Sequence, residues 1–161
     1  RVGDLCEAFA VELGFDEREI KNIKTAGLLH DIGKIAVDSH ILSKKGHLTD
    51  EEWFEIKRHS EIGYRILSSV NGLSDIADSI LAHHENYDGT GYPKKLKGNE
   101  IPIEARIISI ANAFDSMTSP QPYRAALTPK QALDEISRCA GKQFDPDLAR
   151  IFIQNCPLWK L

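Results

Sequence analysis

The chain has 161 residues, of which 42% are hydrophobic and 27% are charged, and its formal net charge is -4. A chain of this length can bury one sizeable core, so we expect one compact domain. The mixed and slightly acidic charge argues against a protein that wraps duplex nucleic acid. No uninterrupted apolar run approaches the roughly 20 residues needed to cross a bilayer, so no membrane contact is expected from this domain.

The cysteines Cys6, Cys139 and Cys156 are odd in number, far apart and in no C-x-x-C arrangement. This spacing indicates neither a disulfide framework nor a thiolate zinc site, and it predicts a reducing, cytoplasmic compartment. The sequence opens at Arg1 inside a helical pattern and without an initiator Met. We therefore expect residues 1–161 to be one domain, truncated at its N-terminus, of a longer chain that carries an upstream sensor or receiver.

The first part of the chain shows two stretches of helical periodicity, which end at Gly14 and before Gly33. Apolar residues recur at helical spacing over residues 2–13, and Gly14 ends the pattern as a C-terminal cap would. Asp16, with Glu19 three residues later, is an N-terminal capping signature for a second helix. That helix delivers His30 and Asp31 at its C-terminal end, and Gly33 permits the backbone to bend away after them.

Residues 35–47 are expected to be mostly connection. Thr49 and Glu52 then form another capping box, for a third helix that continues through residue 67. The apolar face predicted for this helix includes Trp53 and His59, so both side chains are expected on its core side.

Ser74 is a candidate N-cap for a fourth helix, which ends at His83-His84. The following stretch, residues 85–100, contains three glycines and one proline, and long ordered loops of this kind usually carry function. Three further helices are expected over residues 103–117, 128–139 and 145–155. No strand-like alternation is visible, so the predicted fold is all-α, a single compact multi-helix domain with a long Gly/Pro loop after the fourth helix.

Histidines and one carboxylate recur at the ends or on the buried faces of these helices. Taken alone, His59 fits a hydrogen-bonded core histidine better than a ligand, and the pairs His30-Asp31 and His83-His84 are each ambiguous. Together they form a set of neutral imidazoles and a carboxylate, the ligands that Fe, Mn or Zn accept. The sequence therefore predicts a metal site formed by several helices.

The chain resembles the HD-GYP family, a branch of the HD superfamily of metal-dependent phosphohydrolases. The matching stretches follow the family's order along almost the whole sequence: His30-Asp31-Ile32-Gly33-Lys34, Lys57-Arg58-His59, His83-His84-Glu85, Asp88-Gly89-Thr90-Gly91-Tyr92-Pro93, Ala105-Arg106-Ile107, Phe114-Asp115, Pro122-Tyr123-Arg124 and Phe144-Asp145-Pro146.

The resemblance implies an all-helical domain that hydrolyses cyclic di-GMP to pGpG or GMP at two or three divalent metal ions, commonly Fe or Mn. Two cations bridged by a carboxylate such as Asp31 can activate water and neutralise charge on the attacked phosphate. Lys34 would add a point charge to a phosphate oxygen, unless it is a solvated lysine after a helix end. Gly89 and Gly91 allow left-handed backbone and close ligand approach, and Tyr92 offers a ring for guanine or a hydroxyl for phosphate, with a purely structural Tyr-Pro turn as the alternative.

The resemblance also assigns residue roles. The predicted metal ligands are His30, Asp31, His59, His83, His84 and Asn112. Asp31 and Lys34 are the predicted catalytic residues, and Lys34, Gly91, Tyr92, Gln121 and Arg124 are the predicted substrate-binding residues.

Two departures from the family pattern leave an alternative open. Asn112 stands where the family has a metal-ligating aspartate, and an amide binds such cations more weakly than a carboxylate. Gln121 replaces an arginine, so one cationic phosphate contact is lost. The family's ligating histidine before an Arg-Val pair would precede Arg1. The alternative is thus a weak or inactive module that binds the nucleotide or a diguanylate cyclase (GGDEF) partner. A phosphohydrolase of mononucleotides or alarmones is disfavoured by the Gly-Tyr-Pro loop.

Overall fold

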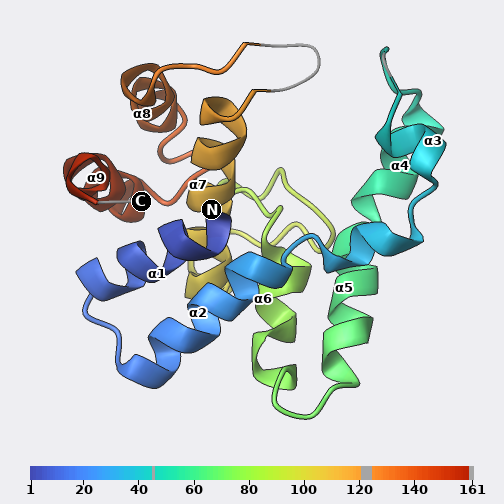
Figure 1. Ribbon diagram of the computed structural model, residues 1–161, viewed down its shortest axis with the longest axis horizontal. Coiled ribbons are helices and arrows are strands. Elements are labelled where there is room, and N and C mark those ends of the chain that lie inside the picture. The colour runs from blue at the N-terminus through green and yellow to red at the C-terminus, as the bar shows by residue number, and fades with distance from the viewer. Residues whose placement is uncertain (45, 121–124, 160–161) are drawn as a thin grey trace.

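The computed structural model describes residues 1–44, 46–120 and 125–159, and its regular secondary structure in these ranges is helical (Figure 1). The α-helices are α1 (Val2–Glu12), α2 (Glu17–Leu29), α3 (Ser39–Leu42), α4 (Asp50–Lys57), α5 (His59–Ser68), α6 (Ala77–Ala82), α7 (Ile103–Thr118), α8 (Pro129–Arg138) and α9 (Pro146–Asn155). The 3-10 helices are η1 (Ile32–Ala36), η2 (Ser74–Ile76), η3 (Gly98–Glu100) and η4 (Cys156–Leu158). The all-α prediction is confirmed. None of the helices in these ranges combines the length and the apolar character that a membrane crossing requires.

Local capping signals set the starts of four helices as the sequence predicts. In the reciprocal boxes, the N-cap side chain accepts from the backbone N–H three residues later, and that residue's side chain accepts from the N-cap backbone. The boxes pair Asp16 with Glu19, Thr49 with Glu52, and Thr128 with Gln131. The Asp145 carboxylate accepts from the backbone of Asp147 and Leu148 and so caps α9.

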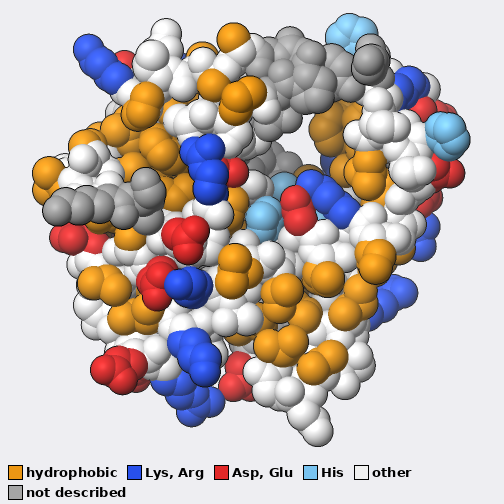
Figure 2. Space-filling view, in the orientation of Figure 1, with side chains coloured by type: hydrophobic (Ala, Val, Ile, Leu, Met, Phe, Trp, Pro, Cys, Tyr) orange, Lys and Arg blue, Asp and Glu red, His pale blue; other side chains and the backbone are white. Residues whose placement is uncertain are grey.

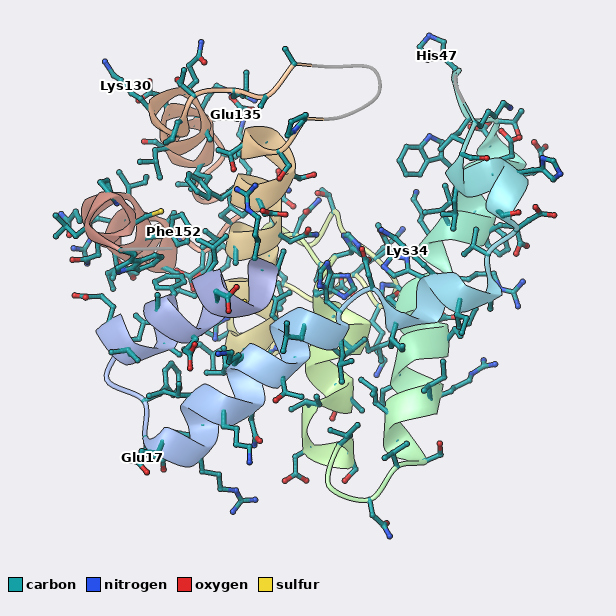
Figure 3. All side chains as sticks on the ribbon, viewed as in Figure 1. Glu17, Lys34, His47, Lys130, Glu135 and Phe152 are labelled. Carbon is teal, nitrogen blue, oxygen red and sulfur yellow. The ribbon has the colours of Figure 1, made fainter. Side chains whose placement is uncertain are left out.

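Helix α7 is the centre of the apolar core and contacts α1, α2, α6, α8 and α9. The Phe9 ring of α1 meets the Phe152 ring of α9 edge-on at 5.1 Å, and Phe114 of α7 meets Phe152 at 5.5 Å. Figure 3 shows Phe152 reaching inward from α9. These rings pack α1 and α9 against the central helix α7, because aromatic pairs add specific edge-to-face contacts to their buried area.

The single helix predicted from residue 49 to residue 67 is wrong in one respect, because it is broken at Arg58 into α4 and α5. His59 Nδ1 bonds the Ile56 carbonyl at 2.6 Å, and Ser60 Oγ donates to the Lys57 carbonyl at 3.2 Å. These side chains take carbonyls that the backbone of residues 60 and 61 would use in a continuous helix. The break leaves His59 buried but Trp53 48% exposed, so Trp53 is not on the core side as predicted.

Two other expectations about the elements also change. Residues 35–47 are less of a simple connection than predicted, because they include the last two residues of η1 and all of α3. Ser74 begins η2 rather than capping a long helix, and α6 has no side-chain N-cap. The long Gly/Pro loop consequently follows α6, the sixth α-helix, and not the fourth.

Candidate metal centre

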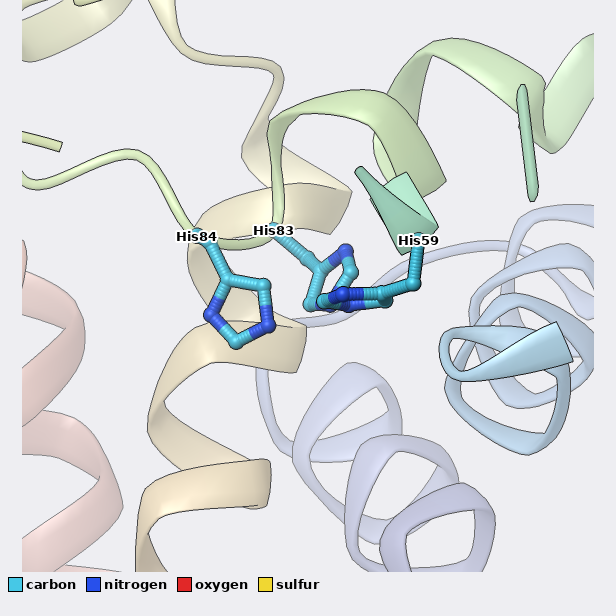
Figure 4. A group of neighbouring side chains, drawn as sticks. All are labelled: His59, His83 and His84. Atoms are coloured by element: carbon cyan, nitrogen blue, oxygen red, sulfur yellow. The ribbon is translucent and has the colours of Figure 1, made fainter. Parts of the chain in front are cut away.

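Three histidines converge where α5 begins and α6 ends. His59 is the first residue of α5, while His83 and His84 directly follow α6. One ring nitrogen from each lies within 4.8 Å of the others, and the Nε2 atoms of His59 and His83 are 3.3 Å apart (Figure 4). The separate segments predicted to aim imidazoles at one point therefore do so.

Backbone carbonyls fix the tautomer of three imidazoles. In each case the Nδ1 atom bonds the carbonyl three residues earlier: His30 to Gly27 at 2.7 Å, His59 to Ile56 at 2.6 Å, and His83 to Ile80 at 2.5 Å. A carbonyl only accepts, so Nδ1 carries the proton and the Nε2 atom of each neutral ring is a bare lone pair. This is the arrangement that orients a histidine for metal binding.

Burial disfavours the protonated form of His59, His83 and His84. His59 and His83 are each 1% exposed. Burial, followed by the effect of His84, holds the pKa of His83 well below its usual value. Burial also lowers the pKa of His59, and it lowers the pKa of His84 to about 3. Neutral imidazoles are the form that a cation needs, because protonation removes the ligating lone pair.

Asp31 brings a carboxylate to the same place. Its Oδ2 lies 3.5 Å from His30 Nε2, and its Oδ1 lies 3.6 Å from His59 Nε2. The Lys34 ammonium donates to Oδ2 at 2.6 Å. Burial alone would raise the pKa of Asp31, but the nearby His30 imidazole and the hydrogen bond and charge of Lys34 outweigh burial, so the pKa is lowered and the group is ionised.

These groups fit a bound cation. Two bare Nε2 atoms facing each other at 3.3 Å repel, and the buried Oδ1 of Asp31 has no hydrogen-bond partner among the described residues. A divalent cation satisfies both the lone pairs and the carboxylate oxygen, and this nitrogen and oxygen donor set suits Fe, Mn or Zn.

The Gly-Tyr-Pro loop lies directly against the histidines. The Tyr92 ring stacks on the His84 ring at 4.9 Å and 19°, and the Lys57 ammonium lies 5.3 Å from the Tyr92 ring centre. Gly91 is needed for close packing, since an added Cβ would be 2.2 Å from the Asn86 nitrogen, whereas the left-handed backbone is at Gly89, with φ +87°. Tyr92 is therefore a structural neighbour of the ligands, whatever else it binds.

Glu85 and Lys57 lie in two of the stretches that match the family, but the sequence assigned no role to either residue. The Glu85 side chain is 2% exposed, and its two oxygens accept from the backbone of Lys94 at 2.7 Å and Leu96 at 3.1 Å. Glu85 thus ties the far side of the Gly-Tyr-Pro loop to the residue next to His84. A carboxylate immediately after a histidine pair was a visible signal, but its partners lie nine and eleven residues away.

Four predicted site residues come from outside the histidine cluster and the loop: Lys34, Asn112, Gln121 and Arg124. Lys34 lies in the middle of the molecule between α7 and the α4–α5 pair (Figure 3). Asn112 is partly buried in the middle of α7, and its membership of the ligand set stays a prediction. Gln121 and Arg124 lie outside the described residues.

Comparisons with known proteins fit this geometry. A family model described as an HD domain matches residues 1–148. A cyclic di-GMP phosphodiesterase of Thermotoga maritima is 42% identical over 156 residues, which are 96% of this chain and 42% of the relative. A 3'3'-cGAMP-specific phosphodiesterase 2 of Vibrio cholerae is 39% identical over 157 residues, 96% of this chain and 30% of the relative.

A crystal structure of a cyclic GMP-AMP-specific phosphodiesterase of Vibrio cholerae, V-cGAP3, has the same fold, with a TM-score of 0.77 at 18% identity over 99% of this chain and 43% of that one. The chain spans less than half the length of each of these proteins. Together, the family match, the histidine cluster and the Gly-Tyr-Pro loop beside it show that the chain belongs to the HD-domain family, in its HD-GYP branch.

Proposed function

We propose that this domain is a phosphodiesterase that hydrolyses cyclic di-GMP to pGpG or GMP. The observation that carries the proposal is the pair of bare Nε2 atoms of His59 and His83, 3.3 Å apart beside the unpartnered Oδ1 of Asp31. The name of the Thermotoga maritima relative supports cyclic di-GMP as the substrate.

The ligands of the proposed centre are His30, Asp31, His59, His83 and His84, with Asn112 as a weaker sixth member. The centre holds two or three divalent cations, Fe or Mn. Bound cations would supply Lewis-acid charge to the phosphodiester and lower the pKa of water.

The protein groups around the cations have their own tasks. Asp31 is ionised and can bridge cations, and Lys34, hydrogen-bonded to it, presents a positive charge where a non-bridging phosphate oxygen would lie. Tyr92 holds His84 in place by stacking. Gly91 keeps the loop close to the ligands, and Gln121 and Arg124 stay proposed contacts to the substrate.

A second candidate substrate is 3'3'-cGAMP, because the Vibrio cholerae relative named for it is 39% identical to this chain. The two cyclic dinucleotides share the phosphodiester linkage and differ in one base, so the same metal chemistry serves both. A non-catalytic binding module is favoured by Asn112, whose neutral amide would weaken the metal shell, and by Gln121, which lacks the charge of the family's arginine.

The test uses the full-length protein loaded anaerobically with Fe or Mn. Cyclic di-GMP and 3'3'-cGAMP are supplied separately, and the products are resolved by chromatography beside an Asn112→Asp variant. Turnover of cyclic di-GMP by the native protein supports the proposal, and we expect the variant to bind metal more tightly and to turn over faster. If the protein cleaves only 3'3'-cGAMP, then 3'3'-cGAMP and not cyclic di-GMP is its substrate. If no metal-loaded form cleaves either dinucleotide, the proposed phosphodiesterase activity is contradicted.

Three further proposals concern the protein beyond this domain. The cysteine usage supports a cytoplasmic location. A diguanylate cyclase domain, which makes the proposed substrate, is a proposed partner. An upstream sensor or receiver is the proposed source of control.

A further inference from the structure

An exposed tryptophan lies on α4, the helix directly before the one that begins with His59. Trp53 is 48% exposed on α4, and its neighbour Phe54 is 65% exposed. Large aromatic side chains gain stability by burial, so an indole left half in water is more informative than a small exposed residue. The exposed face of Trp53 is therefore available to contact a ligand.

The exposed face of α4 leads to the histidine cluster. Trp53 and Lys57 are four residues apart, so their side chains lie on the same side of the helix, and both line one open groove with Asp50 and Phe54. The Lys57 ammonium lies 5.3 Å from the Tyr92 ring centre, and Tyr92 stacks on His84. Tyr92 thus connects His84 to Lys57 of α4, and Lys57 shares its groove with Trp53.

The space beside this series is open. Figure 2 shows a hollow between the part of the molecule formed by α3 and α4 and the rest of the described chain, with histidine, acidic and basic side chains at its floor. Because α4 carries the exposed Trp53 and the floor of the hollow carries histidine and basic side chains, the region suits a ligand with a flat ring and an anionic group.

Tyr92 is the less suitable ring for that ligand. His84 covers one face of Tyr92, and Lys57 approaches its ring centre. A base that stacked on Tyr92 would compete with these neighbours, whereas Trp53 has nearly half of its surface in solvent.

We propose that Trp53 is the stacking platform for one purine base of the cyclic dinucleotide, with Lys57 placed to meet a phosphate between that base and the histidine cluster. This inference rests on the proposed function and adds a specificity-determining residue to it. A cyclic dinucleotide carries its bases outward from its phosphodiester ring, so one base can lie on α4 while a phosphate reaches the metal centre. Charge complementarity favours this occupant, because Lys34 and Lys57 both border the path.

Binding of an uncleavable phosphorothioate analogue of cyclic di-GMP to the metal-loaded full-length protein tests the inference. Calorimetry compares Trp53→Ala with Trp53→Phe, which keeps an aromatic face, and with Val70→Ala, a similarly exposed residue at the end of α5. Truncation to Ala should weaken binding about 5- to 100-fold, because base stacking on an aromatic ring is usually worth that much. Trp53→Phe should retain most of the affinity, and Val70→Ala all of it.

Fluorescence gives a second readout. The domain has only two tryptophans, so Trp159→Phe leaves Trp53 as its only indole. In the Trp159→Phe protein, the fluorescence emission of Trp53 should fall when the protein is saturated with the analogue. Circular dichroism verifies that each variant is folded.

The outcomes separate the two proposals. If the unaltered protein binds the analogue while Trp53→Ala binds it equally well, the platform is wrong and the α4 face is left for a protein partner. Equal losses in Trp53→Ala and Trp53→Phe would also overturn stacking. If the unaltered protein neither binds the analogue nor cleaves either dinucleotide, both the proposed function and the proposed stacking role of Trp53 are wrong.

Discussion

His83 shows how the surroundings of one side chain determine its chemistry. Its Nδ1 is committed to the Ile80 carbonyl, its ring is 1% exposed, and its Nε2 faces that of His59. A buried histidine of this kind is satisfied on one side only. The unsatisfied side is what distinguishes it from an ordinary core histidine, and the cation proposed above is what would complete it.

Replacing His83 with Ala should therefore reduce metal affinity by at least about tenfold, since even the residues that orient a ligand are worth about 10- to 100-fold. Metal content is measured by elemental analysis after dialysis against a defined Fe or Mn concentration. His47→Ala is the control, because His47 is exposed and lies at the outer edge of the molecule (Figure 3). Equal metal content in the two variants would contradict the assignment of His83.

Glu85 is a second single side chain with a defined task, because its carboxylate accepts hydrogen bonds from the backbone of Lys94 and Leu96. Glu85→Gln keeps the size of the side chain, yet its amide group cannot accept from both Lys94 and Leu96. We expect a loss of about 1–3 kcal/mol of stability, the usual cost of leaving a buried polar group unpaired. Faster hydrogen exchange at these two amides would locate the effect in the Gly-Tyr-Pro loop.

The matched control is Glu61→Gln on the exposed side of α5. It should leave both the denaturation midpoint and the loop exchange unchanged. A Glu85→Gln protein with native exchange at Lys94 and Leu96 would show that the loop does not depend on this carboxylate.

At the scale of elements, the junction of η1 and α5 is the most demanding contact in the fold. A Cβ added to Gly33 would lie 1.9 Å from the His59 carbonyl oxygen and 2.7 Å from the Gly63 nitrogen. Both are backbone atoms, which cannot turn aside as a side chain can. The glycine after Asp31 therefore lets η1 pack on the helix that begins with His59, and it brings two of the ligand-bearing segments together.

Gly33→Ala should destabilise the domain by about 1–3 kcal/mol or more, because overpacking forces the backbone to shift. Gly46→Ala is the control, since nothing lies within 4 Å of its added Cβ. Urea denaturation of both variants gives the comparison. Near-native stability of Gly33→Ala would mean that η1 and α5 separate readily.

At the scale of the whole molecule, the candidate centre joins segments that are far apart in sequence. Asp31, His59 and His83 follow or begin different helices, so each would contribute only part of the proposed coordination shell. A cation bound there would stabilise the folded state specifically, since the unfolded chain does not hold these groups together.

Chelation of the metal should accordingly lower the free energy of unfolding, by about 2.7 kcal/mol if free metal had stood at a hundred times its dissociation constant. Calorimetric melting with and without chelator measures the change. In His83→Ala the effect of the chelator should be smaller, about 1.4 kcal/mol for a tenfold loss of metal affinity and less for a larger loss. A chelator effect of equal size in that variant would place the stabilising metal elsewhere.

The helical class and the caps at Asp16, Thr49, Thr128 and Asp145 were predictable from the sequence alone, because capping and periodicity act over a few residues. The candidate ligands were predictable from the histidine pattern and from the resemblance to the HD-GYP family. Tertiary structure decided the rest. The break at Arg58, the exposure of Trp53 and the anchoring of the loop by Glu85 depend on contacts between segments. The 3.3 Å approach of His59 and His83 is likewise a product of packing, since no local pattern records how closely two helix ends will meet.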